Sequence, residues 1–206
     1  MSSADARAQT KIQNIEEQLL TCFRNVHRRQ MVTQKHTESM AENGRVKKKD
    51  GFYMFTIQKT SDSHGILVYK ETQPNGEVIF YIYDPNGKRY INDGYEFNIA
   101  DNRLNNRMSP DRSINDHVGH CALWCIVVII LWNSFSPNDR FIALDLFHAK
   151  MLEAPQTRID FITSIYHLLD KRDFSAQSET KAFVRQVRDI IERLSIGLPI
   201  VLPLQC

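Results

Sequence analysis

The chain has 206 residues, of which 42% are hydrophobic and 24% charged; this balance is typical of a folded domain and excludes a disordered or low-complexity protein. Its formal net charge of +2 at pH 7 excludes a protein that binds nucleic acid through a large overall charge. The longest uncharged apolar run, residues 121–132, is too short to span a bilayer, so we expect no membrane contact.

The cysteines and the first residues of the chain indicate a reducing compartment. Residues 1–20 are polar and lack the apolar segment of a signal peptide, so we do not expect secretion. The four cysteines are too scattered for a disulfide framework: Cys22, Cys121, Cys125 and Cys206. A zinc site that combines the Cys121 and Cys125 pair with His117 and His120 matches no standard spacing, and we predict neither a metal nor a cofactor.

The N-terminal part is predicted to be a helix followed by a linker. Ile12, Ile15 and Leu19 recur at helical spacing within residues 4–30, which favours an amphipathic helix there. The polar stretch 34–50 reads as a loop. It holds a basic cluster formed by Arg45, Lys47, Lys48 and Lys49. Solvated loop charge is the simpler interpretation of this cluster, and weak contact with nucleic acid or another anionic surface is the alternative.

A strand-rich block comes next. Residues 52–57, 65–69 and 77–83 are rich in aromatic and β-branched side chains and predict three strands. Asn75-Gly76 favours a hairpin between the last two strands, because this dipeptide accepts the positive φ angles of tight turns. The turn sequence at 84–87 ends the third strand, and residues 88–118 are expected to be irregular.

The last part of the chain reads as helical. Residues 121–135 are apolar and partly β-branched, and their length favours a buried helix over a strand. Three further helices are predicted at 139–153, 156–171 and 177–196. The order of elements is helix, strands, buried helix, helices, which predicts an α+β fold rather than alternating β and α units.

Cys121 has the sequence context of a nucleophile. It stands at the predicted start of the buried helix, where unpaired N–H groups and the helix dipole favour the reactive thiolate. An inert core cysteine is the alternative interpretation. Cys125, one helical turn later, is expected to be structural.

A cysteine nucleophile needs a base, and the base needs a partner that orients it. His64 lies at the start of the second predicted strand and Asp84 at the end of the third, so antiparallel pairing of these two strands brings the two residues to the same edge of the sheet. We therefore expect Asp84 to orient His64, and His64 to accept the Cys121 proton. Alternatively, His64 is an ordinary loop histidine and Asp84 only forms a turn. A third possibility is that His117 or His120 acts as the base instead of His64.

Three segments together resemble a known family. They are residues 64–69, residues 78–87 and Gly119-His120-Cys121-Ala122-Leu123-Trp124-Cys125. Their order and context are similar to the adenovirus endopeptidase and its relatives, which include SUMO-specific proteases and maturation proteases of large DNA viruses and virophages. The resemblance implies a small mixed β-sheet flanked by helices and a papain-like site in permuted chain order. It also implies the residue order His, acid, amide, Cys.

Two positions depart from the family pattern. Gly65 stands where many relatives have tryptophan after the histidine. The relatives' oxyanion glutamine falls near Asn115, whose side-chain amide can donate a hydrogen bond from a shorter stem. We assign the oxyanion role to Asn115, together with the backbone N–H of Cys121; Asp116 and Asn106 are the less favoured substitutes.

The predicted protein is a thiol endopeptidase formed by one domain over residues 1–206. Its parts would be an N-terminal helix and linker at 1–45, a catalytic core at 50–135 and a helical part at 139–206. By resemblance it would cut after small residues, at Gly-X bonds of viral capsid precursors, in the virion and in the host cytoplasm or virus factory. Two alternatives remain: a protease that removes SUMO or ubiquitin-like modifiers, and a non-enzymatic virion or nucleic-acid-binding protein on a degenerate protease scaffold.

Overall fold

The computed structural model describes residues 10–12, 14–15, 17–19, 22–33, 49–58, 63–88, 104–115 and 120–200. They form a mixed α+β structure, as predicted. The chain divides into two compact units. A strand-rich unit runs from Asn25 to Cys125. A helical unit combines residues 1–24 with residues 126–206.

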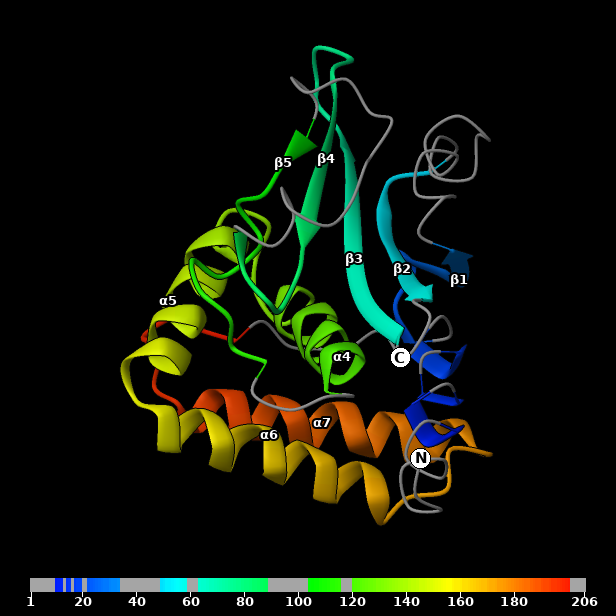
Figure 1. Ribbon diagram of the computed structural model, residues 1–206, viewed down its shortest axis with the longest axis vertical. Helices are drawn as coiled ribbons and strands as arrows, with labels where there is room; N and C mark the ends of the chain where they lie inside the picture. The colour runs from blue at the N-terminus through cyan, green and yellow to red at the C-terminus, as the bar shows by residue number, and fades with distance from the viewer. Residues whose placement is uncertain are drawn as a thin grey trace. The chain divides into compact units, whose positions relative to one another are not determined.

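The described part of the strand-rich unit contains a five-stranded sheet whose strands lie in chain order (Figure 1). The strands are β1 (Val26–Thr33), β2 (Gly51–Gln58), β3 (Ser63–Thr72), β4 (Val78–Tyr83) and β5 (Leu104–Asn105). Strands β2, β3 and β4 are antiparallel, whereas β1 pairs in parallel with β2 and β5 in parallel with β4. The sheet is therefore mixed.

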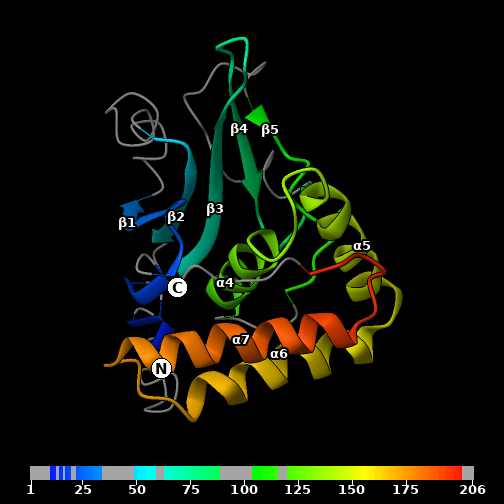
Figure 2. The same cartoon turned by 180° about the vertical axis from the view of Figure 1, so that it is seen from behind.

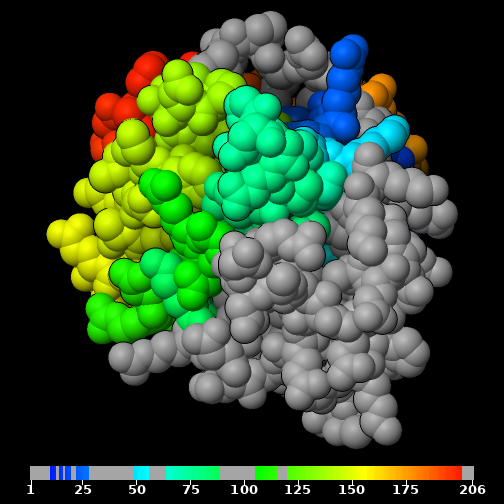
Figure 3. Space-filling model, turned by 90° about the horizontal axis from the view of Figure 1, so that it is seen from above, coloured from blue at the N-terminus to red at the C-terminus, as the bar shows by residue number. Residues whose placement is uncertain are grey.

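The predicted hairpin is formed by β3 and β4. Gly76 in its turn has a φ of +84°, and its N–H donates to the carbonyl of Gln73 at 2.9 Å. Pairing runs from Thr72 opposite Val78 to Leu67 opposite Tyr83, so the loop spans residues 73–77. The end of this hairpin lies on the face of the molecule shown in Figure 3. The asparagine–glycine pattern thus predicted the turn correctly.

The predicted helix over residues 4–30 is wrong at its C-terminal end. The described residues between 10 and 22 are helical, but the chain then turns at Asn25 and enters β1. The carbonyl of Asn25 accepts the N–H of Phe52 at 2.6 Å, and pairing of β1 with β2 follows from there. Residues 26–30 carry no glycine or proline to mark the change, so a prediction from periodicity extends the helix too far.

Within the region expected to be irregular, the described residues 104–115 include one short strand. Phe80 pairs with Leu104 and Tyr81 with Asn105, which adds β5 to the edge of β4. A strand of two residues shows no alternation of apolar and polar side chains, and the pattern therefore gave no indication of it. The residues from 106 to 115 form turns and bends, as predicted.

The apolar run folds as the helix α4 (Cys121–Trp132), as its length predicted. Residues 123–131 are fully buried. The helix begins in the strand-rich unit, which contributes its first turn, and continues into the helical unit. Cys121 is its first residue, which is the position expected for a nucleophile that uses the free N–H groups of a helix start.

The helical unit confirms the three predicted C-terminal helices. They are α5 (Arg140–Glu153), α6 (Pro155–Asp170) and α7 (Gln177–Arg193), and Figure 2 shows α6 and α7 side by side. Arg172, between α6 and α7, pairs with Glu179 at 2.7 Å. No helix built from the described residues is both long enough and apolar enough to cross a bilayer.

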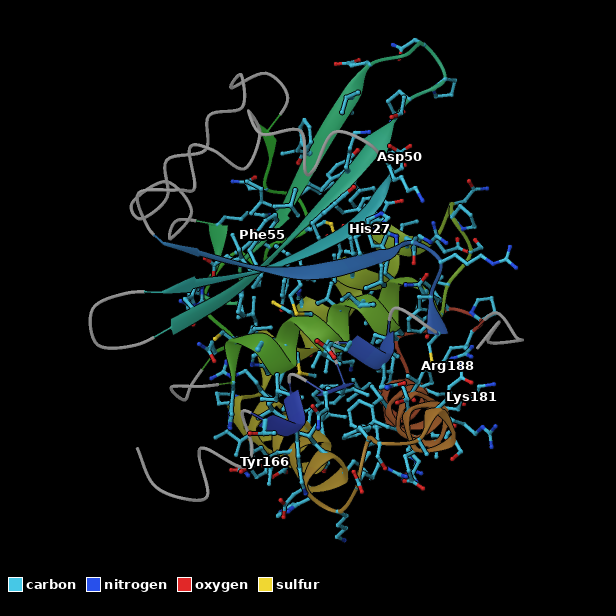
Figure 4. All side chains as sticks on the ribbon, turned by 90° about the vertical axis from the view of Figure 1, so that its right-hand side faces the viewer. His27, Asp50, Phe55, Tyr166, Lys181 and Arg188 are labelled. Atoms are coloured by element: carbon cyan, nitrogen blue, oxygen red, sulfur yellow. The ribbon has the colours of Figure 1, made fainter. Side chains whose placement is uncertain are left out.

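Asp50 fixes the start of β2 to neighbouring strands. Its carboxylate accepts hydrogen bonds from Lys70 Nζ at 3.1 Å, Thr72 Oγ1 at 2.8 Å and the Thr72 N–H at 3.0 Å. Its carbonyl lies 2.9 Å from His27 Nε2, and Figure 4 labels both residues. Because Lys70 is buried, the carboxylate of Asp50 is the partner that offsets the desolvation of its ammonium group.

Asp50→Ala is expected to lower the free energy of unfolding by about 2 kcal/mol, because Lys70 loses its anionic partner while it stays buried. Urea unfolding monitored by circular dichroism measures the change. Asp111→Ala is the matched control, since Asp111 is 77% exposed and pairs with a part-exposed Lys88; a surface pair of this kind contributes less than about 1 kcal/mol. Equal losses in the two variants would contradict the assignment.

Candidate active site

The hairpin brings His64 and Asp84 together. His64 is the second residue of β3, and Asp84 directly follows β4. The imidazole Nε2 lies 2.9 Å from Asp84 Oδ1, and both side chains are buried. A carboxylate is an acceptor only, so Nε2 carries the hydrogen in this contact. The juxtaposition predicted from antiparallel pairing is present.

Cys121 completes the arrangement. Its sulfur accepts the backbone N–H of Gly65 at 3.2 Å and is hydrogen-bonded to the His64 side chain. Since Asp84 engages Nε2, Nδ1 is the ring nitrogen left to face the thiol. Sulfur, imidazole and carboxylate therefore lie in one hydrogen-bonded line, with contributions from β3, from the end of β4 and from the first residue of α4.

Asp84 is the most deeply buried member of this line. Cys121 and His64 are 5% and 7% exposed, whereas Asp84 is completely buried. The reacting pair therefore retains some surface, and the orienting carboxylate retains none. Burial of the carboxylate strengthens its electrostatic effect on the imidazole, because water screens the interaction less.

The turn that follows Asp84 holds its carboxylate, and Ser109 holds its backbone. The backbone N–H of Asp84 donates to Ser109 Oγ at 2.9 Å, and that hydroxyl donates to the carbonyl of Ile82 at 2.9 Å. The backbone N–H of Asn86 donates to Asp84 Oδ1 at 2.8 Å. One carboxylate oxygen therefore accepts both the imidazole and a peptide N–H, which fixes its position.

Loop 104–115 packs directly on the turn that follows β4. The N–H of Lys88 donates to the carbonyl of Pro110, and the N–H of Ile114 to that of Pro85, both at 2.9 Å. Gly87 has a φ of +99°, and a Cβ at this position would lie 2.9 Å from the carbonyl carbon of Arg112. Only glycine fits both the conformation and the contact.

The structure places Asn115 beside Asn86. Asn115 Nδ2 donates to Asn86 Oδ1 at 3.1 Å, and Asn86 Nδ2 lies 3.4 Å from His64 Nε2. The amide that we assigned to the oxyanion is thus connected to the base through Asn86. Its oxyanion role stays a prediction; in this structure its amide nitrogen donates to Asn86.

Asn86 and Ser109 are the residues that the sequence analysis missed. Asn86 was assigned only a turn role within 84–87, and Ser109 lay in the stretch expected to be irregular. The β3–β4 register, continued past Tyr83, places residue 86 opposite His64. Counting residues from the hairpin turn would have predicted that Asn86 lies near His64. Ser109 comes from a separate loop, and no sequence pattern indicates its contact with Asp84.

Gly65 allows α4 to begin against β3. A Cβ on Gly65 would lie 3.1 Å from both the nitrogen and the Cα of Ala122, which is tighter than an ordinary contact. The absence of a side chain at residue 65 therefore has a steric reason. The close approach also brings the Gly65 N–H to the Cys121 sulfur.

The environment favours a thiolate–imidazolium pair. Burial alone would lower the pKa of His64, but its hydrogen bonds to Asp84 and Cys121 and their negative charges raise it to about 9. Burial likewise would raise the pKa of the Cys121 thiol, but the hydrogen bond and charge of His64 and the N–H groups of Gly65 and Ala122 lower it below its usual 9.0. Each group thus stabilises the charge of the other.

Several predicted residues lie outside the described part of the chain. They are Arg45, Lys47, Lys48, Asp116, His117, Gly119 and Cys206. Lys49 is described, and its carbonyl accepts the Tyr53 hydroxyl at 2.7 Å. Asn106 is exposed, and His120 directly precedes α4. Within the described ranges, no three His, Cys, Asp or Glu side chains are grouped as a metal site.

Comparison with known proteins adds no assignment: no protein-family model and no curated protein matches this chain. We therefore infer function from the geometry and chemistry of the residues themselves.

Gly65→Ala is expected to lower the reactivity of Cys121 about tenfold, because a displacement of a fraction of an ångström misaligns sulfur and imidazole. The rate of iodoacetamide modification of Cys121 at pH 7, followed by peptide mass spectrometry, measures the loss. Gly76→Ala is the control: a Cβ there meets open space, and its positive φ affects the turn alone. An unchanged rate in Gly65→Ala would refute the steric argument.

Asp84→Asn is expected to shift the pH at which Cys121 becomes reactive. Without the carboxylate, the pKa of His64 falls from about 9, and the imidazolium no longer stabilises the thiolate. The pKa of Cys121 therefore rises, so the midpoint of alkylation against pH moves upward. A midpoint identical to that of the wild-type protein would show that Asp84 does not act on the pair.

Proposed function

We propose that this protein is a cysteine endopeptidase of the adenovirus-protease type. The observation that carries the proposal is the hydrogen-bonded line of Cys121, His64 and Asp84. It supplies a nucleophile, a base and a group that orients the base, which is the set that acyl transfer by a thiol requires. The order of these residues along the chain and their places on the strands and the helix agree with the resemblance to that family.

The chemistry follows from the charges of the pair. The Cys121 thiolate attacks the scissile carbonyl carbon, and the carbonyl oxygen becomes an oxyanion that the Cys121 N–H is placed to stabilise. His64 gives its proton to the leaving amine as the C–N bond breaks and the thioester forms. Water, deprotonated by His64, then attacks the thioester carbonyl carbon; the C–S bond breaks, the new carboxyl product leaves, and the Cys121 thiolate is restored beside the protonated His64. With a pKa of about 9, the imidazole holds the required proton at neutral pH.

The substrate part of the proposal comes from the resemblance. We propose polypeptides cut after small residues at Gly-X bonds, with capsid precursors as the natural class and the virion or virus factory as the place. The buried Asp84 carboxylate and the hydrogen-bonded Cys121 thiol support an enzyme rather than a degenerate scaffold. Pairing a desolvated Asp84 with His64 gives no advantage to a protein without catalytic activity.

Cys121→Ala and His64→Ala are expected to abolish cleavage, with losses above about 10⁴-fold, and Asp84→Ala to reduce it by roughly 10³-fold. Purified full-length protein is incubated with peptides containing Gly-X bonds and with SUMO and ubiquitin fusions, and products are identified by mass spectrometry. Cys125→Ala, one turn along the same helix, is the matched control and should still cleave.

The substrate panel separates the candidate functions. Cleavage of Gly-X peptides supports the proposed endopeptidase, whereas cleavage of the modifier fusions alone would favour a deconjugating protease with the same residues. Full activity in Cys121→Ala would overturn the mechanism. If no substrate is cut and the protein binds DNA with a steep salt dependence, the scaffold alternative would replace the proposal.

A further inference from the structure

Gly65 lies where β3 has lost one of its two neighbouring strands. β2 stays paired with β3 as far as Ser63, whereas the pairing with β4 ends at Leu67, which is opposite Tyr83. At Gly65, the edge of β3 that β4 has left is therefore not covered by any strand of the described residues. The Gly65 N–H donates to the Cys121 sulfur at 3.2 Å, so the sulfur takes the place of a backbone acceptor.

Pro85 is the residue that a longer ladder would place opposite Gly65. The last β3–β4 pair is Leu67 with Tyr83. Two residues further in the same register, Pro85 comes opposite Gly65. A hydrogen-bonded antiparallel pair exchanges two N–H···O bonds. Proline has no N–H for one of them, and the carbonyl of Pro85 accepts the N–H of Ile114 at 2.9 Å. The ladder therefore stops before this pair.

The same proline shapes the turn that carries the acid. The N–H of Gly87 donates to the carbonyl of Asp84 at 3.0 Å, which closes a β-turn with Pro85 at its second position. Proline presets the φ angle that this position requires. It also keeps the preceding residue extended, so Asp84 continues the direction of β4. Asn86 Nδ2 lies 3.4 Å from His64 Nε2, and the turn thus stays beside β3 although the ladder has ended.

A residue with an N–H at position 85 would compete with the sulfur. It could complete the pair with Gly65, whose N–H would then donate to the carbonyl of residue 85. A peptide carbonyl is a stronger acceptor than a thiol sulfur, which accepts only weakly. The Cys121 thiolate would lose this donor to the sheet.

We propose that Pro85 is a positioning residue for the nucleophile: it ends the β3–β4 ladder before Gly65 and so reserves the Gly65 N–H for the Cys121 sulfur. The thiolate then has a backbone donor besides the imidazolium of His64, and this donor does not titrate. The peptide N–H holds the sulfur in place before it attacks. This consequence for catalysis rests on the proposed peptidase function.

The first measurement observes the Gly65 amide directly by NMR. Full-length protein labelled with ¹⁵N-glycine contains eight glycines, and the signal of Gly65 is identified by its loss in Gly65→Ala. An amide proton that donates to sulfur shifts when the thiol ionises. The Gly65 signal is therefore expected to titrate with the pH midpoint of Cys121 alkylation by iodoacetamide, and to lose this midpoint in Cys121→Ala. A Gly65 signal that does not follow the alkylation midpoint would overturn the inference.

The second measurement restores an N–H at residue 85. Pro85→Ala and Pro85→Val are each expected to raise the alkylation midpoint by about one pH unit, because one hydrogen bond to a thiolate changes its stability roughly tenfold. The shift of the Gly65 signal should become smaller in both. Pro110→Ala is the matched control: Pro110 is buried and its carbonyl accepts the Lys88 N–H at 2.9 Å, but it lies outside the β3–β4 register. Thermal unfolding confirms that the variants fold.

The Pro85 and Pro110 variants keep the titratable groups around the sulfur, which are His64, Asp84, Tyr83 and Cys125. Peptide cleavage is measured in parallel. Folded Pro85 variants with an unchanged midpoint, or an equal rise in Pro110→Ala, would overturn the inference, and wild-type cleavage by these proteins would leave the peptidase proposal standing. Raised midpoints confined to the Pro85 variants of a protein that cleaves nothing would support the inference and overturn the peptidase.

Discussion

The candidate site depends on one atom, Asp84 Oδ1. It accepts the imidazole of His64 and the peptide N–H of Asn86, inside a region from which water is excluded. A buried carboxylate is costly unless charged or polar donors surround it. Here the donors to Oδ1 come from the same hairpin that carries the base and from the turn that follows it, so folding of β3 on β4 holds this oxygen and orients the imidazole at once.

Sequence reasoning predicted the parts of the site that local patterns encode. Asn75-Gly76 predicted the hairpin, and the geometry of antiparallel pairing then predicted that His64 lies near Asp84. The length of the apolar run that starts at Cys121 predicted a helix despite its β-branched residues. These features are encoded in spacing and composition, which a single sequence displays in full.

The remaining features depend on contacts between distant segments. The register of the hairpin is set by a five-residue loop from Gln73 to Glu77, and an error of one position hides the relation between Asn86 and His64. Ser109 supports Asp84 from another loop, and the spacing of apolar residues in the sequence does not indicate such a contact. The strand β1 was missed for a related reason. Its residues favour neither helix nor strand, and their conformation is decided by pairing with β2.

Base and nucleophile are coupled through a single peptide unit. The group that donates to the Cys121 sulfur is the N–H of Gly65, and this N–H belongs to the amide bond that joins Gly65 to His64. A twist of the hairpin therefore carries the imidazole and the sulfur's donor along together. Substitutions at the far end of the hairpin can thus accumulate without changing how the imidazole and the Gly65 N–H are placed relative to each other.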